Sequence, residues 1–265
     1  MRKILFLFTF TLLLTACTQR VDDAALAKER VNYARQLVDS GKWNQAKMEL
    51  DSVHTLYPKQ VAVRRAAKAL SDSIRFLESV RNLAFADSVN EILSQRAQQL
   101  QKEFVYSRNE KYEDTGYYIH KKLYHSGSPV TCLQASVSDD AQVSLRSYVT
   151  GKTLNHRVIA LKAGDVEQSA DGSLHVIGNG TDRCEITTIS DDGAMTLLNF
   201  ISSNTNADIR VVASGDNETT YNLSHNTIEG LCKTYELAIT MRDIKNARHQ
   251  IKVANAILEK AEKSK

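Results

Sequence analysis

The sequence is poor in the residues that mark several large classes of protein. Its 265 residues contain 2 Pro, 11 Gly, 4 Cys and 1 Trp, while 42% are hydrophobic and 25% are charged. This composition excludes a disordered chain, a collagen-like repeat and a small disulfide-rich fold. The net charge of +3 gives no reason to expect a nucleic-acid partner. The length suits one large domain or two ordinary ones.

The sequence also lacks the short motifs of common catalytic and cofactor sites. It contains no HExxH zinc helix, phosphate-binding loop, nucleophile elbow or CxxC pair. The histidines and the stretches Ser138 to Asp140 and Ser190 to Asp192 fit sheet, surface and turn positions better than zinc or calcium sites. We therefore expect a protein that is not an enzyme and that holds no cofactor or metal.

The first seventeen residues have the pattern of an export signal. Arg2 and Lys3 precede an uninterrupted run of apolar and Thr residues from Ile4 to Ala16, and Cys17 follows. A helix of that length reaches about 20 Å, which is short of the ~30 Å hydrocarbon core of a membrane. The segment is therefore expected to be a cleaved signal peptide, residues 1–16.

The end of this segment, Leu14-Thr15-Ala16-Cys17, resembles the lipobox of bacterial lipoproteins. The resemblance implies cleavage before Cys17, lipid attachment to its sulfur, and stable anchoring of the protein in a membrane. Thr18 rather than Asp follows the cysteine, which implies the outer membrane in a bacterium with two membranes. The alternative is a secreted protein cut after Ala16, with Cys17 left as a free thiol.

After a short linker, residues 17–21, two helices are predicted over 22–38 and 43–56, because apolar residues recur at helical spacing and Ser40-Gly41 and Pro58 stop the helices. Residues from about 27 to 60 resemble one tetratricopeptide repeat. The residues that carry this resemblance are Tyr33, Ala34, Leu37, Gly41, Trp43, Ala46, Leu50, Val53 and Pro58. A single repeat cannot bury its own faces, so residues 22–60 are expected to form a helical hairpin capped by the next helix.

Two much longer helical patterns flank the middle of the chain. One covers residues 61–105, either as one helix or as two that meet near Asn82, and the other covers 225–265 with Ser224 or Asn226 as its cap. Helices of this length need a partner along most of their length. The simplest partner is the other long helix, antiparallel, although pairing between chains is equally consistent with the sequence. The oligomeric state is therefore open.

Between these helices, residues 106–224 have the period of two that is typical of strands. Strands are predicted over 117–120, 130–137, 143–149, 158–161, 174–177, 184–189, 209–213 and 219–223, with a short helix over 195–202. Asp171-Gly172 and Asn179-Gly180 indicate hairpins, while Asp139-Asp140 and Asp191-Asp192 indicate longer turns. The fold class is thus α+β, with an antiparallel β domain inserted between two long helices.

The candidate binding residues are tyrosines at the start of this domain. The residues selected are Tyr112, Tyr117, Tyr118, His120 and Tyr124. Such a group could contact a glycan or a peptide. However, the predicted β domain contains no Trp, and 8 Lys and Arg stand against 14 Asp and Glu in residues 112–224. Packing of the tyrosines within the sheet is therefore the favoured interpretation, and nucleic acid is disfavoured.

Three cysteines remain after the lipobox. Since disulfides can form outside the cytoplasm, Cys132 and Cys184 are the pair expected to form one if a bond exists. Free buried thiols are equally consistent with a domain of this size.

Taken together, these features predict an envelope lipoprotein without catalytic activity that acts as an interaction or scaffold protein with an envelope partner. A loose likeness in layout and composition relates the chain to uncharacterised lipoproteins of Bacteroidota. Two alternatives remain: a lipoprotein that binds a glycan or peptide, and a hydrolase with an unfamiliar site.

Overall fold

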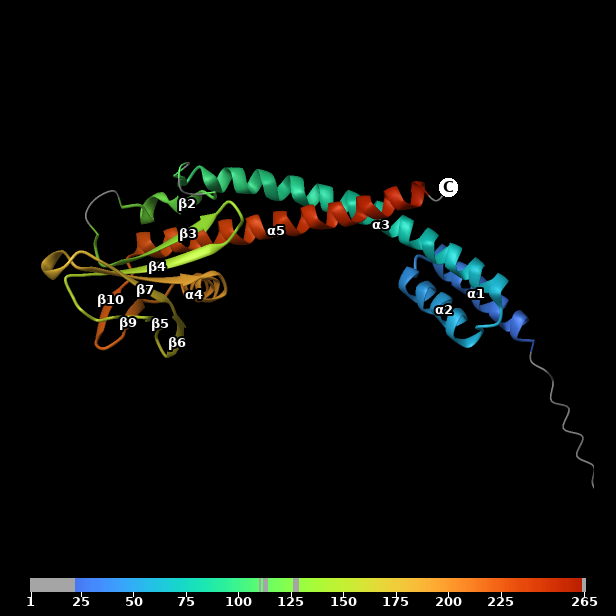
Figure 1. Cartoon of the computed structure of the whole chain (residues 1–265), viewed down its shortest axis with the longest axis horizontal. Coiled ribbons are helices and arrows are strands. Elements are labelled where there is room, and N and C mark those ends of the chain that lie inside the picture. The colour runs from blue at the N-terminus through green and yellow to red at the C-terminus, as the bar shows by residue number, and fades with distance from the viewer. Residues whose placement is uncertain (1–21, 110, 112–113, 126–128, 264–265) are drawn as a thin grey trace, which may run out of the picture. The chain divides into compact units, whose positions relative to one another are not determined.

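The computed structural model describes residues 22–109, 111, 114–125 and 129–263. The lipidation residue Cys17 and the candidate Tyr112 lie outside the described residues. The chain divides into two compact units. Unit 1 contains the residues up to Val80 together with those from Ile257 onward, and unit 2 contains Arg81–Ala256. The elements of both units are labelled in Figure 1.

Unit 1 is built from α1 (Asp23–Asp39), α2 (Trp43–Leu56) and the first half of α3 (Val61–Gln101). The predicted hairpin is confirmed almost to the residue. The Asp22 carboxylate caps α1 by accepting from the Ala24 N–H, and Gly41 ends the helix with a φ of +74°, a conformation that glycine adopts without strain. Small and medium residues form the common core: Ala27, Val31, Ala34, Leu37, Ala46, Leu50, Val53, Val63, Ala67 and Ile74.

Unit 2 contains the second half of α3 and most of α5 (His225–Glu262), packed against each other as an antiparallel pair. Their direction follows from two contacts, Arg96 with Glu236 and Asn90 with Arg248. Ser224 caps α5 as predicted, since its Oγ accepts from the Thr227 N–H. The seam between the helices consists of Leu93, Ala97, Leu100, Leu237, Met241 and Ile244.

The β domain of unit 2 has two antiparallel sheets, which confirms the predicted fold class. The larger has the order β1 (Phe104–Ser107), β2 (Tyr117–His120), β3 (Cys132–Ser138), β4 (Val143–Thr150), β8 (Cys184–Ser190) and β7 (Ser173–Ile177). The smaller has the order β10 (Glu218–Asn222), β9 (Ile209–Ser214), β5 (Val158–Ala163) and β6 (Val166–Asp171).

A single hydrophobic cluster joins the two sheets to α4 (Asp191–Ser203) and the first turns of α5. Strand β4 shows how the sequence directs this packing. Its residues alternate strictly between buried and half-buried, with Val143, Leu145, Ser147 and Val149 on the buried side. The same face of β3 contributes Leu133, Ala135 and Val137, because directly opposed residues of paired strands share a face.

The structure corrects four local predictions. Helix α3 is continuous through Asn82 and ends at Gln101, and Phe104 begins a strand instead of extending a helix to 105. Strand β6 was missed because its sequence, VEQSAD, is mostly polar and exposed at a sheet edge. Asp171-Gly172 connects β6 to β7, which belong to different sheets, so it does not form the predicted hairpin. Asp191-Asp192 forms the start of α4 instead of the predicted turn.

Candidate functional site

The structure does not bring the predicted tyrosine group onto one surface. Tyr117 pairs with Ser138 and Tyr118 with Val137, so the two adjacent side chains point to opposite faces of the larger sheet. Tyr118 packs against the seam between α3 and α5, with its ring 4.9 Å from that of Tyr106. Tyr118 therefore contributes to packing, which is the interpretation that the sequence favours for these tyrosines.

His120 is also part of the packing between the sheet and the helices. It is 3% exposed, and its ring meets that of Phe104 edge-on with centroids 5.1 Å apart. Its Nδ1 accepts from the Lys122 N–H, and its Nε2 lies 3.6 Å from the Glu103 carboxylate. Burial lowers the pKa of His120, although Glu103 opposes this effect. The arrangement stabilises a neutral, structural imidazole.

Tyr124 lines a separate hollow of about 200 Å³ on the outer face of the sheet. Its lining also includes Ile119, His125, Cys132, Gln134 and Tyr148. The Gln134 amide donates to the Leu123 carbonyl and accepts from the Tyr148 hydroxyl, so these two lining side chains are already bonded within the fold. The volume of the hollow is below the range of about 300–1,000 Å³ that is usual for ligand pockets.

Of the two alternatives that the sequence left open for the cysteines, the structure has the free thiols, at Cys132, Cys184 and Cys232. Cys132 lies on β3 and Cys184 on β8, and β4 runs between these two strands. Two strand spacings of about 4.8 Å each exceed the ~7 Å limit between the Cα atoms of a disulfide. Burial raises the pKa of the Cys132 thiol to about 11, which keeps it protonated and unreactive at neutral pH.

A buried polar network surrounds Glu185 on β8. The carboxylate is 0% exposed and accepts six hydrogen bonds, from three backbone N–H groups, the Arg183 guanidinium twice and the His156 ring. Burial by itself raises the pKa of Glu185, but the hydrogen bonds from His156, Arg183 and the backbone outweigh burial and lower it to about 2. These bonds hold the segment from Leu154 to His156, where the chain crosses from one sheet to the other.

A paired Glu and His, such as Glu185 and His156, would support the hydrolase hypothesis if a substrate could reach the two side chains. However, His156 is also 0% exposed. Among the described residues, no group of three His, Cys, Asp or Glu is arranged to hold a metal ion. The network therefore acts on the fold, as a clamp between the two sheets.

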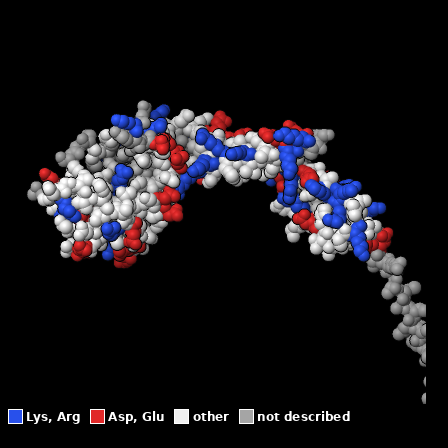
Figure 2. Space-filling model, in the orientation of Figure 1, with Lys and Arg blue, Asp and Glu red and all other residues white. Residues whose placement is uncertain are grey.

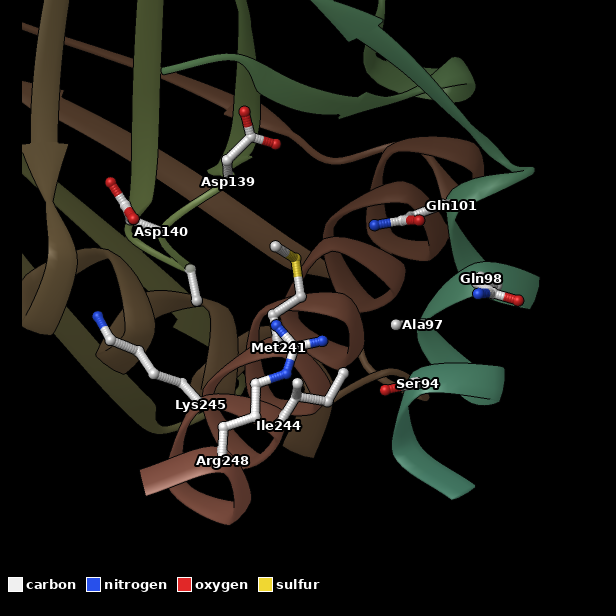
Figure 3. Close-up of a pocket in the computed structure, with 11 residues that line it drawn as sticks. Ser94, Ala97, Gln98, Gln101, Asp139, Asp140, Met241, Ile244, Lys245 and Arg248 are labelled. Atoms are coloured by element: carbon white, nitrogen blue, oxygen red, sulfur yellow. The ribbon is translucent and has the colours of Figure 1, made fainter. Parts of the chain in front are cut away.

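The candidate site with accessible chemistry is a hollow of about 400 Å³ in unit 2, which we call the charged hollow (Figure 3). It lies where the turn between β3 and β4 meets α3 and α5. The lining residues are Ser94, Ala97, Gln98, Gln101, Asp139, Asp140, Ala141, Met241, Ile244, Lys245 and Arg248. Its volume is within the range of ligand-binding pockets.

The charged hollow has opposite charges on different walls. Figure 3 shows Asp139 and Asp140 on the β3–β4 turn, Gln98 and Gln101 on α3, and Met241, Lys245 and Arg248 on α5. Within the described residues, Asp140 and Lys245 form no ion pair with each other or with any other side chain. The hollow thus offers an unpaired carboxylate and an unpaired ammonium group, together with carboxamides that both donate and accept.

The turn that carries Asp139 and Asp140 is held firmly. Asp139 accepts a hydrogen bond from the Tyr106 hydroxyl at 2.8 Å and another from the Gly116 N–H at 2.9 Å. The hydrogen bond between Tyr106 and Asp139 raises the pKa of Tyr106. Ala141 has a φ of +62°, a strained backbone conformation for a residue with a Cβ. Its carbonyl accepts from Arg242 at 3.2 Å. Strain retained in a fixed turn is a feature of binding sites.

A second hollow of about 530 Å³, the Phe85 groove, lies along the same helix pair and shares no lining residue with the first. Phe85 is 71% exposed at its edge. The other apolar residues that line the groove are Ala86, Val89, Leu93 and Ala247, and the polar lining residues are Asn82, Asp243, Asn246 and Gln250. A large exposed aromatic beside an apolar groove is typical of an interaction surface.

Sequence reasoning missed both hollows because their walls are distant in the chain. The charged hollow combines residues 94–101, 139–141 and 241–248. Asp139-Asp140 was identified, but as a turn.

Comparison with known proteins identifies only the start of the chain. Residues 1–18 match the family model for the prokaryotic membrane lipoprotein lipid attachment site. The chain is therefore a membrane-anchored lipoprotein of the cell envelope, as the lipobox predicted. No curated protein and no solved structure matches the chain. No helix among the described residues is long and apolar enough to cross a membrane.

Proposed function

We propose that this lipoprotein is an interaction protein whose unit 2 binds an envelope partner protein along the α3–α5 pair. The observation that carries the proposal is the 71% exposure of Phe85 beside an apolar groove of about 530 Å³. Burying a phenylalanine side chain contributes about 2 kcal/mol, so its exposure leaves binding energy available to a partner. An amphipathic helix laid into such a groove is a common mode of recognition.

The groove is suited to a helix by its shape and its chemistry. Its apolar residues Phe85, Val89 and Leu93 recur at intervals of four along α3, so they line one side of that helix. On α5, the amides of Asn246 and Gln250 provide a polar border. This combination of an apolar centre and a polar rim is typical of protein interfaces.

A second candidate function, binding of a peptide, is favoured by the charged hollow. Asp140 attracts an ammonium or guanidinium group, and Lys245 attracts a carboxylate. A peptide with both charges would satisfy the two side chains at once, and the amides of Gln98 and Gln101 would meet its backbone. A glycan would leave both charges without a partner.

The remaining proposals concern location and relatives. We propose the outer membrane as the destination, because Thr18 rather than Asp follows Cys17. We also propose that residues 27–60 form a tetratricopeptide-like hairpin, and that proteins of this layout occur in Bacteroidota. Separation of inner and outer membranes followed by detection of the lipoprotein tests the destination, and finding it in the inner membrane would overturn this proposal.

Site-directed photo-cross-linking in intact cells tests the interaction. A photoreactive amino acid replaces Phe85 in one variant and the exposed edge-strand residue Val166 in a control. We expect one partner to be captured by mass spectrometry at position 85 and not at 166. Equal capture at both positions, or none at either, contradicts a specific interface in the groove.

Two further variants separate the protein partner from the peptide. In Phe85→Ser, we expect the cross-linked partner recovered through a second α3 position, Val89, to fall at least tenfold with no loss of folding. The double variant Asp140→Asn, Lys245→Gln leaves the groove intact. If only this double variant loses the partner, the charged hollow is the recognition site and the groove proposal is wrong.

A further inference from the structure

The side of unit 1 where α1 meets α3 carries two cations beside a shallow groove. Lys28 and Arg35 on α1 line a shallow groove of about 330 Å³, together with Asn32 and with residues at the start of α3. Residues 28, 32 and 35 are spaced by four and three positions, so they share one side of the helix. We call this side chain row the α1 cation row.

Three other cations of unit 1 form ion pairs, but within the described residues those of the α1 cation row do not. Arg30 pairs with Glu49, Lys47 with Glu78, and Lys68 with Asp72. Within the described part of the chain, Lys28 and Arg35 form no ion pair, even though Asp39 lies one turn beyond Arg35. Among the described residues, Arg35 makes one side-chain hydrogen bond, to Asn32 at 3.3 Å.

The floor of the groove is apolar and its walls are low. Val31 and Val63 are buried, and the exposed rim on α3 consists of Ala62 and Ala66. These short side chains leave the two cations accessible from outside. Figure 2 shows Lys and Arg side chains over much of the visible face of unit 1.

The lipid anchor limits how far this unit can lie from a membrane. Only residues 18–21 separate Cys17 from Asp22, which caps α1. Five steps of at most about 3.6 Å place Asp22 within roughly 18 Å of the lipidated cysteine. Lys28 and Arg35 follow at about 9 and 20 Å along α1. If α1 lies along the surface, both cations reach the layer of lipid headgroups.

From these two observations, we propose that the α1 cation row binds the phosphate groups of anionic lipids in the membrane that holds the anchor. Lys28 and Arg35 contact the phosphates, and Asn32 donates a further hydrogen bond from its side-chain amide. The contact fixes how unit 1 lies on the membrane, which the lipid alone cannot do. Contacts between basic side chains and an anionic surface weaken as salt rises.

Vesicle binding of the chain without its lipid tests this proposal. The mature chain with Cys17→Ser is mixed with vesicles of phosphatidylcholine alone or with vesicles of which a third is phosphatidylglycerol. We expect binding only to the anionic vesicles. The variant Lys28→Gln, Arg35→Gln should bind at least tenfold more weakly, because each basic residue at an anionic surface contributes about fivefold.

A control with the same change in net charge makes the result specific. Lys42 and Arg75 are exposed cations of unit 1 outside the groove, and the variant Lys42→Gln, Arg75→Gln should keep most of the binding. Equal loss in both double variants shows an attraction due to net charge only and overturns the proposal. Equal binding to neutral vesicles overturns it as well.

The same experiment distinguishes lipid phosphates from free phosphate. Sodium phosphate and sodium chloride of equal ionic strength should reduce vesicle binding equally. A much stronger effect of phosphate would show a site for the free ion instead of the membrane. Circular dichroism melting curves, expected to be the same for all variants, verify that each chain is folded.

Discussion

Two carboxylates on the β domain, Glu185 and Asp140, are used in opposite ways. Glu185 is completely buried and accepts six hydrogen bonds within the fold. Asp140 lies on a turn at the rim of the charged hollow and has no ion-pair partner among the described residues. A charge removed from water must be paired inside the protein, whereas a charge that water can reach remains free to bind a ligand.

The comparison teaches where to look for function in this protein. The Glu–His pair has the residue types of a catalytic site, but every polar atom of the Glu185 carboxylate is already occupied by the chain. The hollow has no recognisable motif, but it keeps opposite charges unpaired on its walls. Availability of a group to a ligand is therefore a better guide here than residue type.

The largest effect is expected from Glu185→Gln. The N–H groups of the new side-chain amide would face the backbone and side-chain donors that now bind the carboxylate, so these donors would lose their acceptor. Arg183 would also lose its counter-charge. We expect a loss of about 3 kcal/mol in the free energy of unfolding, measured from urea midpoints. A loss below about 1 kcal/mol would show that the network does not clamp the sheets.

The sequence predicted regular elements well where the hydrophobic period was strong. Helix α2 was placed at its observed bounds, and the alternation of Val143, Leu145 and Val149 identified β4. Strand β6 was not predicted because an edge strand needs few apolar residues. The end of α3 was predicted wrongly because the spacing of Phe104 is compatible with a helix or with a strand. Only its pairing with His120 identifies the strand.

The candidate sites could not be predicted in the same way. Tyr117 and Tyr118 are adjacent in sequence, yet the sheet sends them to opposite faces, while Gln101, Asp140 and Lys245 are distant in sequence and line one hollow. The pairing of Cys132 with Cys184 depended on which strand lies between them. Strand order is set by long-range packing, which periodicity does not contain.

Acid unfolding should reveal the pairing of Glu185 as an effect that grows gradually with acidity and at most equals that of the substitution. Because the folded state lowers the pKa of Glu185 from 4.5 to about 2, this group stabilises the fold fully above pH 4.5. The contribution, up to about 3 kcal/mol, is lost as the pH falls from 4.5 toward 2. Urea midpoints at a series of pH values measure it. Glu185→Gln should have a flatter acid limb than the unaltered chain, and parallel limbs would contradict the assignment.

The smallest effect on stability is expected from the matched change Asp140→Asn. This substitution also converts a carboxylate into an amide of the same shape, but no ion pair is lost within the described structure and water still reaches the side chain. We therefore expect the free energy of unfolding to change by less than about 0.5 kcal/mol. Binding of a peptide that carries a cationic group, measured by calorimetry, should instead fall severalfold. If Asp140→Asn destabilised the fold as much as Glu185→Gln, Asp140 would be a structural group and the contrast between the two carboxylates would be wrong.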